Sequence, residues 1–184
     1  MTLARKLIVT EFMTLDGVVE DPMWSFPYWN DETSAFKAEE TDRGQDMLLG
    51  RVTYEQFARA WPGRSAEEGG AYFNPARKFV VSTTLTKDVW QNASFLRGDV
   101  RKEIERLKSE AGPDLVVHGS ITLARWLLRE GLVDELRLLV YPITGEPGRR
   151  LFEGDVTTKL QLASSQATSK GVLELVYRPA PAAP

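Results

Sequence analysis

The sequence has no cysteine and only one histidine, His118. Without cysteine there can be no disulfide bond, no thiolate nucleophile and no zinc–sulfur site. A single histidine cannot build a histidine-rich metal site, and a Ser-His-Asp triad would have to use His118. We therefore expect no metal centre and no cysteine-based catalysis.

Long apolar runs and dense basic runs are missing too. No segment approaches the ~20 apolar residues of a membrane span. The apolar stretch at the N-terminus is broken by Glu11 and is too short for a secretory signal. Proteins that bind nucleic acids usually present a basic face, whereas the net charge here is −3. The expected location is the cytoplasm, with neither a membrane nor a nucleic acid as partner.

The composition that is present is typical of one globular domain. The 184 residues are 42% hydrophobic and 27% charged, without an internal repeat or a linker. We expect a single domain over residues 1–178. Residues 179–184 consist of proline, alanine and no other residue type, and we expect this tail to be disordered.

Apolar runs that end at glycine alternate with stretches of helical spacing. Strands are expected at residues 7–10, 46–50, 78–82 and 114–118. Helices are expected at residues 31–43, from Thr53, after the cap residue Asp99, and after Ser120. Residues 20–30 lack periodicity and are expected to form a loop. A long alternating strand at 133–142 then precedes an antiparallel pair at 160–164 and 172–177. The pattern predicts an α/β fold with a mainly parallel mixed sheet, helices on both sides and a C-terminal antiparallel hairpin.

A strand runs through glycine into a helix at two places. These are Gly50-Arg51-Val52-Thr53 and Gly119-Ser120-Ile121-Thr122. Glycine allows close approach of a ligand, and a helix N-terminus offers free N–H groups and partial positive charge. Two such turns on one parallel sheet predict a diphosphate site at the carboxyl edge of the strands. The alternative is that the turns are ordinary connections of an α/β protein.

Side chains near these turns offer further phosphate ligands. Arg51 follows its glycine directly and can bind a phosphate in a fork geometry, and the Thr53 hydroxyl can help. Ser82, Thr83 and Thr84 end the third strand with three hydroxyls that suit a ribose phosphate. The alternatives are a solvated arginine and plain turn chemistry at the strand end.

Two ionisable candidates lie elsewhere. His118 ends a buried strand just before Gly119, where it can act in catalysis or, as the favoured alternative, satisfy a backbone partner. Glu32 lies one helical turn before Phe36 on the same face. A carboxylate there can anchor a heterocycle through paired hydrogen bonds, or, as the favoured alternative, belong to a solvated helix face.

Taken in order, these motifs resemble the dihydrofolate reductase-like superfamily, and among its members the reductase domain of the bifunctional riboflavin-biosynthesis deaminase-reductase and its stand-alone relatives. The resemblance covers about Lys6 to Tyr177. It rests on Leu7-Ile8-Val9 through Leu15-Asp16-Gly17-Val18, Leu48-Leu49-Gly50-Arg51-Val52-Thr53-Tyr54, Phe79-Val80-Val81-Ser82-Thr83-Thr84, Val116-Val117-His118-Gly119-Ser120-Ile121-Thr122-Leu123, Leu132-Val133-Asp134-Glu135-Leu136, Tyr141-Pro142 and Arg149-Arg150-Leu151-Phe152.

The resemblance implies a three-layer α/β/α sandwich, NADPH as cofactor and an oxidoreductase activity. It implies cofactor contacts at Gly17, Gly50, Arg51, Thr53, Ser82, Thr83, Gly119, Ser120, Ile121 and Thr122. Glu32 stands four places before Phe36-Lys37, which is the place of the substrate-binding acid in dihydrofolate reductases, so the catalytic role carries over to it. The sequence departs from the relatives at Ser120, where dihydrofolate reductases have a second glycine, and in the loop 143–148. Residues 1–184 do not include a counterpart of the deaminase half.

The functional prediction is an NADPH-dependent reductase. It transfers a hydride to a small heterocycle of the pteridine or 5-amino-6-(5-phosphoribosylamino)uracil type. The alternative is a nucleotide-binding or regulatory module without turnover, and a hydrolase is disfavoured because no nucleophile–base pair is visible. A homodimer is expected because the strand 133–142 has apolar residues on both faces, and the resemblance implies the same. The alternative is that helices of the same chain cover both faces.

Overall fold

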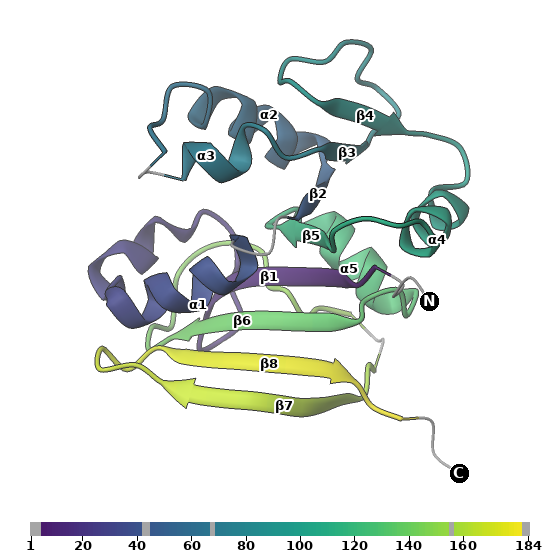
Figure 1. Ribbon diagram of the computed structural model, residues 1–184. Coiled ribbons are helices and arrows are strands. Elements are labelled where there is room, and N and C mark those ends of the chain that lie inside the picture. The colour runs from purple at the N-terminus through teal and green to yellow at the C-terminus, as the bar shows by residue number, and fades with distance from the viewer. Residues whose placement is uncertain (1–4, 42–44, 67–68, 155–156, 182–184) are drawn as a thin grey trace.

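The computed structural model describes residues 5–41, 45–66, 69–154 and 157–181. They form one eight-stranded sheet with the strand order β4-β3-β2-β5-β1-β6-β8-β7 (Figure 1). The strands are β1 (Leu7–Thr14), β2 (Asp46–Gly50), β3 (Lys78–Val81), β4 (Ala93–Leu96), β5 (Leu115–His118), β6 (Glu135–Tyr141), β7 (Leu160–Ala167) and β8 (Leu173–Pro179). The first six pair in parallel, and β8 pairs antiparallel with β6 and β7. The predicted sheet with its C-terminal hairpin is confirmed.

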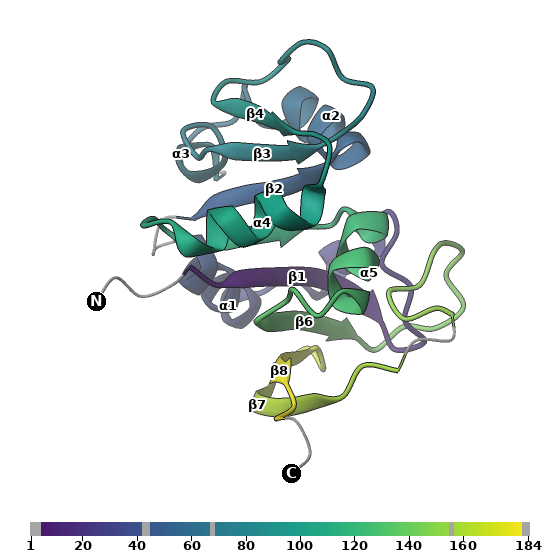
Figure 2. The same ribbon diagram turned by 90° about the vertical axis from the view of Figure 1, so that its right-hand side faces the viewer.

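Helices cover both faces of this sheet. They are η1 (Pro22–Tyr28, a 3-10 helix), α1 (Asp31–Thr41), α2 (Arg51–Ala60), α3 (Gly70–Phe73), α4 (Val100–Ser109) and α5 (Ile121–Arg129). Figure 1 and the turned view in Figure 2 show α4 and α5 on one face and α1 on the other. The helices α4 and α5 bury Ile104, Leu107 and Leu127 against β1, β5 and β6, while α1 and α2 pack on the opposite side. The three-layer sandwich is therefore as predicted.

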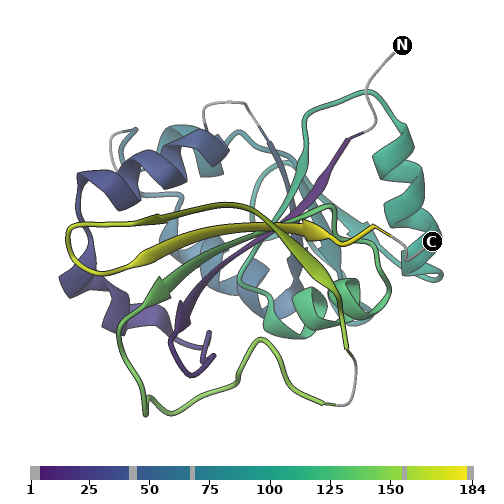
Figure 3. The same ribbon diagram turned by 90° about the horizontal axis from the view of Figure 1, so that it is seen from below.

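The strand β6 is covered within the single chain. All seven of its residues are buried, with β1 on one side and β8 on the other. One face packs with α5 through Leu136, and the other packs with α1 through Leu139. The two apolar faces of this strand therefore need no second subunit, which is the alternative that the sequence left open. The exposed residues of this part of the sheet lie mainly on β7, at the outer side of the C-terminal hairpin. Figure 3 shows the hairpin from that side.

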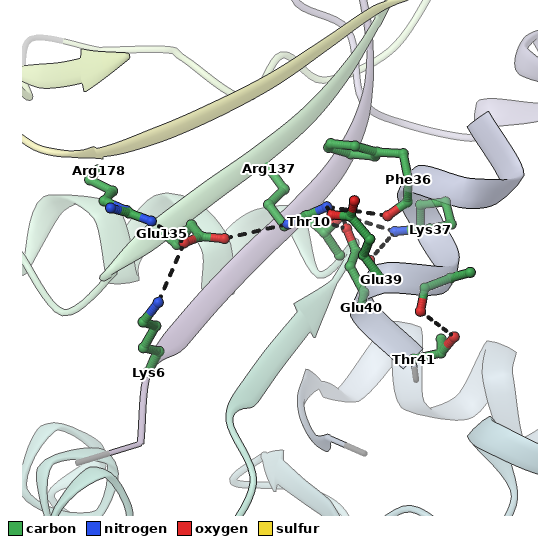
Figure 4. A network of polar contacts seen from close by, with 11 residues as sticks. Lys6, Thr10, Phe36, Lys37, Glu39, Glu40, Thr41, Glu135, Arg137 and Arg178 are labelled. Atoms are coloured by element: carbon green, nitrogen blue, oxygen red, sulfur yellow. Dashed lines mark hydrogen bonds and ion pairs between the residues drawn. The ribbon is translucent and has the colours of Figure 1, made fainter. Parts of the chain in front are cut away.

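The layer between α1 and the sheet is rich in buried charge, as Figure 4 shows. Arg137 donates from Nε to Glu40 Oε1 at 3.0 Å, and its guanidinium lies 4.2 Å from the centre of the Phe36 ring. Thr10 donates to Glu40 at 2.9 Å, and Lys37 donates to Thr10 at 2.9 Å and to Glu40. Burial alone would raise the pKa of Glu40, but Lys37 and Arg137 hold it below its ordinary value. The network fixes α1 on β1 and β6.

Several expected boundaries were wrong. Residues 20–30 contain the 3-10 helix η1, because Pro22 starts a helical turn without any apolar periodicity. The helix expected from Thr53 begins at Arg51. The sequence also did not predict β4 or the four-residue helix α3. The expected end of the helix 31–43 falls outside the described residues.

The first residues of the expected disordered tail are instead paired in the sheet. Pro179 belongs to β8, and the Ala180 N–H donates to the Lys159 carbonyl at 3.0 Å. Pairing with β7 therefore orders these first tail residues. Residues 182–184 lie outside the described part of the chain. Within the described ranges, no helix is both long and apolar enough to span a bilayer.

Candidate functional site

The two predicted glycine turns lie side by side at the carboxyl ends of β2 and β5. The Gly50 N–H donates to the Ser120 hydroxyl at 3.0 Å, and the Ser120 N–H donates to the Thr53 hydroxyl at 3.0 Å. These two bonds join the start of α2 to the start of α5. They place Gly50, Thr53, Gly119 and Ser120 in one cluster, as the sequence predicted for a phosphate site.

Both helices begin without a side-chain cap. Gly50 precedes α2 and Ser120 precedes α5, and within the described residues neither N-cap residue accepts a hydrogen bond through its side chain from its helix. By contrast, Asp99 caps α4 by accepting from the Lys102 N–H at 3.2 Å. The first N–H groups of α2 and α5, those of Arg51 and Ile121 included, are therefore available to an anion.

The backbone between β5 and α5 has an unusual conformation. Gly119 has φ +58° and Ser120 has φ +56°, so two consecutive residues are left-handed. Glycine adopts this conformation freely, whereas serine pays a steric cost. Two hydrogen bonds hold Ser120 in this conformation: its hydroxyl accepts from the Gly50 N–H, and its own N–H donates to the Thr53 hydroxyl. Ser120 therefore stands where a second glycine would fit the backbone, and its two hydrogen bonds connect the starts of α2 and α5.

Other predicted cofactor residues lie around this cluster. Arg51 is exposed and pairs with Glu55 at 3.0 Å, so its guanidinium is held at the outer side of α2. Ser82 is buried and accepts from the N–H groups of Thr84 and Leu85 at 3.2 and 3.0 Å. Its hydroxyl serves the turn, and Thr83 beside it is exposed.

The loop after β1 and the loop after β6 meet at the same edge. Gly17 has φ +94°, and its carbonyl accepts from the Leu151 N–H at 2.9 Å. Arg149 donates to Thr122 Oγ1 at 3.3 Å and forms an ion pair with Glu20 at 2.8 Å. Arg149 thus lies at the first turn of α5. The sequence showed it only as part of an arginine pair, and no spacing linked it to Thr122.

Glu32 lies in the first turn of α1. In the folded chain it contacts Ser169, in the turn between β7 and β8. Its Oε2 accepts from Ser169 Oγ at 2.6 Å, from the Ser169 N–H at 2.8 Å and from Asn30 Nδ2 at 2.8 Å. The Ser169 hydrogen bonds, the side-chain one first, lower the pKa of Glu32. The carboxylate is therefore ionised at neutral pH and ties α1 to the turn between β7 and β8.

Aromatic residues form a wall next to α1. Trp24 lies edge-on to Tyr141 with ring centres 5.3 Å apart, and Phe12 lies 5.9 Å from Trp29. Phe36 packs in the core with Leu139, and Phe12 and Trp24 pack against the same cluster.

Two buried ionisable side chains at the end of the β1–β5 ladder each have an unpaired polar atom among the described residues. Among the described residues, neither His118 Nε2 nor Glu11 Oε1 has a hydrogen-bond partner. Burial lowers the pKa of His118 to about 3 and raises the pKa of Glu11 to about 8. His118 is therefore neutral, with its Nε2 unpaired among the described residues. Glu11 was not singled out, although a charged residue within an apolar strand is a usable signal.

Comparisons with known proteins agree with this geometry. The chain is 25% identical over 179 residues to an uncharacterized protein of Bacillus subtilis (strain 168), YyaP, covering 94% of both chains. The fold resembles a putative riboflavin biosynthesis protein from Shewanella sp. PV-4 with a TM-score of 0.73 and 19% identity, covering 95% of this chain and 99% of that one. It also resembles the dihydrofolate reductase of Enterococcus faecalis, whose structure is complexed with NADP(H) and RAB-propyl. That match has a TM-score of 0.66 and 15% identity, and covers 95% of this chain and 96% of the reductase.

The solved structures establish the dihydrofolate reductase-like fold that the sequence predicted. The family is established by the sequence match itself. The model of the RibD C-terminal domain matches residues 5–173, which include every strand from β1 to β7 and both glycine turns. The chain therefore belongs to the RibD C-terminal domain family.

Proposed function

We propose that the protein is an NADPH-dependent reductase that transfers a hydride to a small heterocycle of the pteridine or 5-amino-6-(5-phosphoribosylamino)uracil type. The family and the fold support a reductase-type role. The observation that carries the proposal is the pair of uncapped helix starts at Gly50 and Ser120, joined by hydrogen bonds at the carboxyl edge of the sheet.

The residues of this edge fit a dinucleotide. The N–H groups at the starts of α2 and α5 suit its diphosphate. Arg51 and the end of β3, with Ser82 and Thr83, lie on the side of β2 away from β5, where they suit the adenosine end and its extra phosphate. Gly17, Thr122 and the loop after β6 lie on the side of β1. NADPH would supply the hydride, while the protein provides binding, orientation and electrostatics.

The substrate would lie on the α1 side of β1. Phe12 and Trp29 offer apolar surface there, and Glu32 offers an ionised carboxylate. An ionised carboxylate accepts hydrogen bonds from ring N–H and amino groups, so Glu32 suits a nitrogen heterocycle. We assign it to anchoring the heterocycle, with the proton of the reduction coming from solvent.

The competing proposal is a nucleotide-binding module on the same fold without turnover. Its supporting observation is that Glu32 is already bonded three times, to Ser169 and Asn30. A substrate must displace or share these bonds. The module would bind NADPH as the reductase does but would not consume it.

One set of measurements separates these possibilities. Calorimetry with NADPH and NADH tests the cofactor site, and we expect tighter binding of NADPH. Loss of absorbance of NADPH in the presence of dihydropteridines, pteridines and phosphoribosylaminouracils then tests turnover. Binding without consumption of NADPH supports the silent module, equal affinities reject the phosphate assignment, and no binding of either cofactor rejects both proposals.

We also propose that the protein forms a homodimer through the outer surface of the C-terminal hairpin. The strand β7 lies at one edge of the sheet, and its residues are exposed or half-exposed. Leu162 and Leu173 remain 48% and 40% exposed in the single chain. An edge strand with exposed leucines is a surface that proteins normally pair or cover.

A further inference from the structure

Glu11 occupies the place where two central strands part. The ladder between β1 and β5 runs from Leu7↔Leu115 to Thr10↔His118 and then ends. Beyond it β1 continues to Thr14 beside β6 alone, with Glu11 opposite Leu138. Glu11 is thus the first residue of β1 without a β5 residue beside it. Its neighbour on that side is the turn at Gly119 and Ser120, which the proposed function assigns to the cofactor diphosphate.

The side chain of Glu11 belongs to an apolar face. Because side chains alternate along a strand, Glu11 shares the face of Val9 and Met13, which pack in the core with α5. Glu11 is only 4% exposed, and among the residues that the structure describes its Oε1 contacts no hydrogen-bond donor. A buried polar atom without a partner is unfavourable, and a bound ligand is one way to supply that partner to Glu11 Oε1.

The surroundings favour the neutral acid. Burial raises the pKa of Glu11 to about 8, and the opposing charge is Lys37 of α1. On β5 the titratable group is His118, which burial keeps neutral. On α5 the charged residues are Arg125, which binds the Arg150 carbonyl and Glu153, and the exposed Arg129. At neutral pH Glu11 is therefore a protonated acid and a hydrogen-bond donor.

The order of the strands decides which part of the cofactor reaches this donor. In the order β3-β2-β5-β1, a diphosphate held between β2 and β5 leaves the adenosine end over β3 and the nicotinamide end over β1. A dihydronicotinamide carries a carboxamide whose oxygen accepts hydrogen bonds. We propose that Glu11 is a cofactor-binding residue whose neutral carboxyl donates a hydrogen bond to the carboxamide oxygen of the nicotinamide ring. This inference rests on the proposed NADPH site and adds a residue to it.

Three forms of the protein test the role of Glu11. Glu11→Gln keeps a donor that does not titrate, and Glu11→Met removes the donor at similar volume. NADPH binding is measured by calorimetry at about pH 7 and about pH 9.5, on either side of the pKa of a raised carboxyl. We expect the wild type to lose about tenfold more affinity than Glu11→Gln at the higher pH, and Glu11→Met to bind about tenfold more weakly than Glu11→Gln at both. Any pH effect of the cofactor itself persists in Glu11→Gln and is subtracted.

The wild type alone provides a second measurement, which does not depend on how the variants fold. If NADPH binds the protonated acid, binding at about pH 8.5 takes up protons. Calorimetry in buffers of different ionisation enthalpy detects this uptake. Absence of uptake, or the same pH dependence in the wild type and Glu11→Gln, rejects the role of Glu11 while NADPH binding stands. Absence of NADPH binding by the wild type at about pH 7 rejects the proposed function itself.

Discussion

The Ser120 hydroxyl accepts a hydrogen bond from the Gly50 N–H at 3.0 Å, and this bond joins the carboxyl end of β2 to the start of α5. Replacement of Ser120 by alanine leaves the half-buried Gly50 N–H unpaired while the left-handed backbone at residue 120 remains. We expect Ser120→Ala to lose about 1 kcal/mol of unfolding free energy, as measured by urea denaturation.

Ser120→Gly is the matched control for that change. It loses the same hydrogen bond but relaxes the left-handed conformation, which costs a non-glycine residue about 1–2 kcal/mol. We therefore expect Ser120→Gly to unfold at a higher urea concentration than Ser120→Ala. The reverse order would show that the backbone at Ser120 is not strained.

Arg51→Ala tests the phosphate assignment without disturbing the core. Its ion pair joins the exposed Arg51 to the half-exposed Glu55 at the surface of α2, so we expect a stability loss of under about 1 kcal/mol. A charge-assisted contact with a phosphate is worth about 1.5–3 kcal/mol, so the affinity for NADPH should fall about ten- to a hundredfold. Glu55→Ala is the control, and it should keep the affinity of the wild type. A variant that binds NADPH normally but melts much earlier would make Arg51 a structural residue.

Because His118 is buried and neutral, we expect the free energy of unfolding to fall in acid. Burial lowers its pKa to about 3 from an ordinary value of 6.5, so the unfolded chain binds more protons between these values. The stability that neutral His118 contributes is complete above about pH 6.5 and is lost as the pH falls towards about 3. In a series of urea titrations, His118→Gln should flatten this acid branch relative to the wild type. Parallel curves for the two proteins would contradict the assignment of a buried neutral histidine.

The proposed dimer predicts a mass near twice the 20.7 kDa of one chain. Light scattering coupled to size exclusion measures it at micromolar concentration. Leu162→Arg on β7 should restore the mass of one chain, because a charge on the pairing surface opposes association. Val89→Arg, at a residue that is 60% exposed in the β3–β4 connection, should leave the mass unchanged. A mass of one chain for the wild type, unchanged on concentration, contradicts the dimer.

The sequence predicted elements best where local rules apply. Apolar runs found β2 within its observed bounds, and the aspartate cap at Asp99 found the start of α4. The strand β4 was missed because Ala93–Leu96 is short, half-exposed and without alternation. The helix α3 was missed because a four-residue helix has no periodicity to detect.

For the candidate site, too, the sequence predicted the local features and missed the contacts between distant residues. The two glycine turns were visible because each is a local strand–glycine–helix pattern. The bonds that join them, and the bond from Glu32 to Ser169, connect residues far apart in the chain. No local pattern encodes such contacts. The unpaired state of Glu11 likewise depends on the point at which β5 leaves β1, which only the assembled sheet determines.

The position of β1 in the sheet has a consequence for how the chain folds. This first strand lies between β5 and β6, whose residues Leu115 and Leu136 pair with Leu7 and Val9. Its partners therefore emerge from the ribosome roughly a hundred residues after it, and loops of that length are slow to close. Until then the apolar strand at the N-terminus stays exposed on both edges, where chaperones and other nascent chains can reach it. A chain shortened before β6 should aggregate rather than form a smaller domain, because its central strand would lack one neighbour.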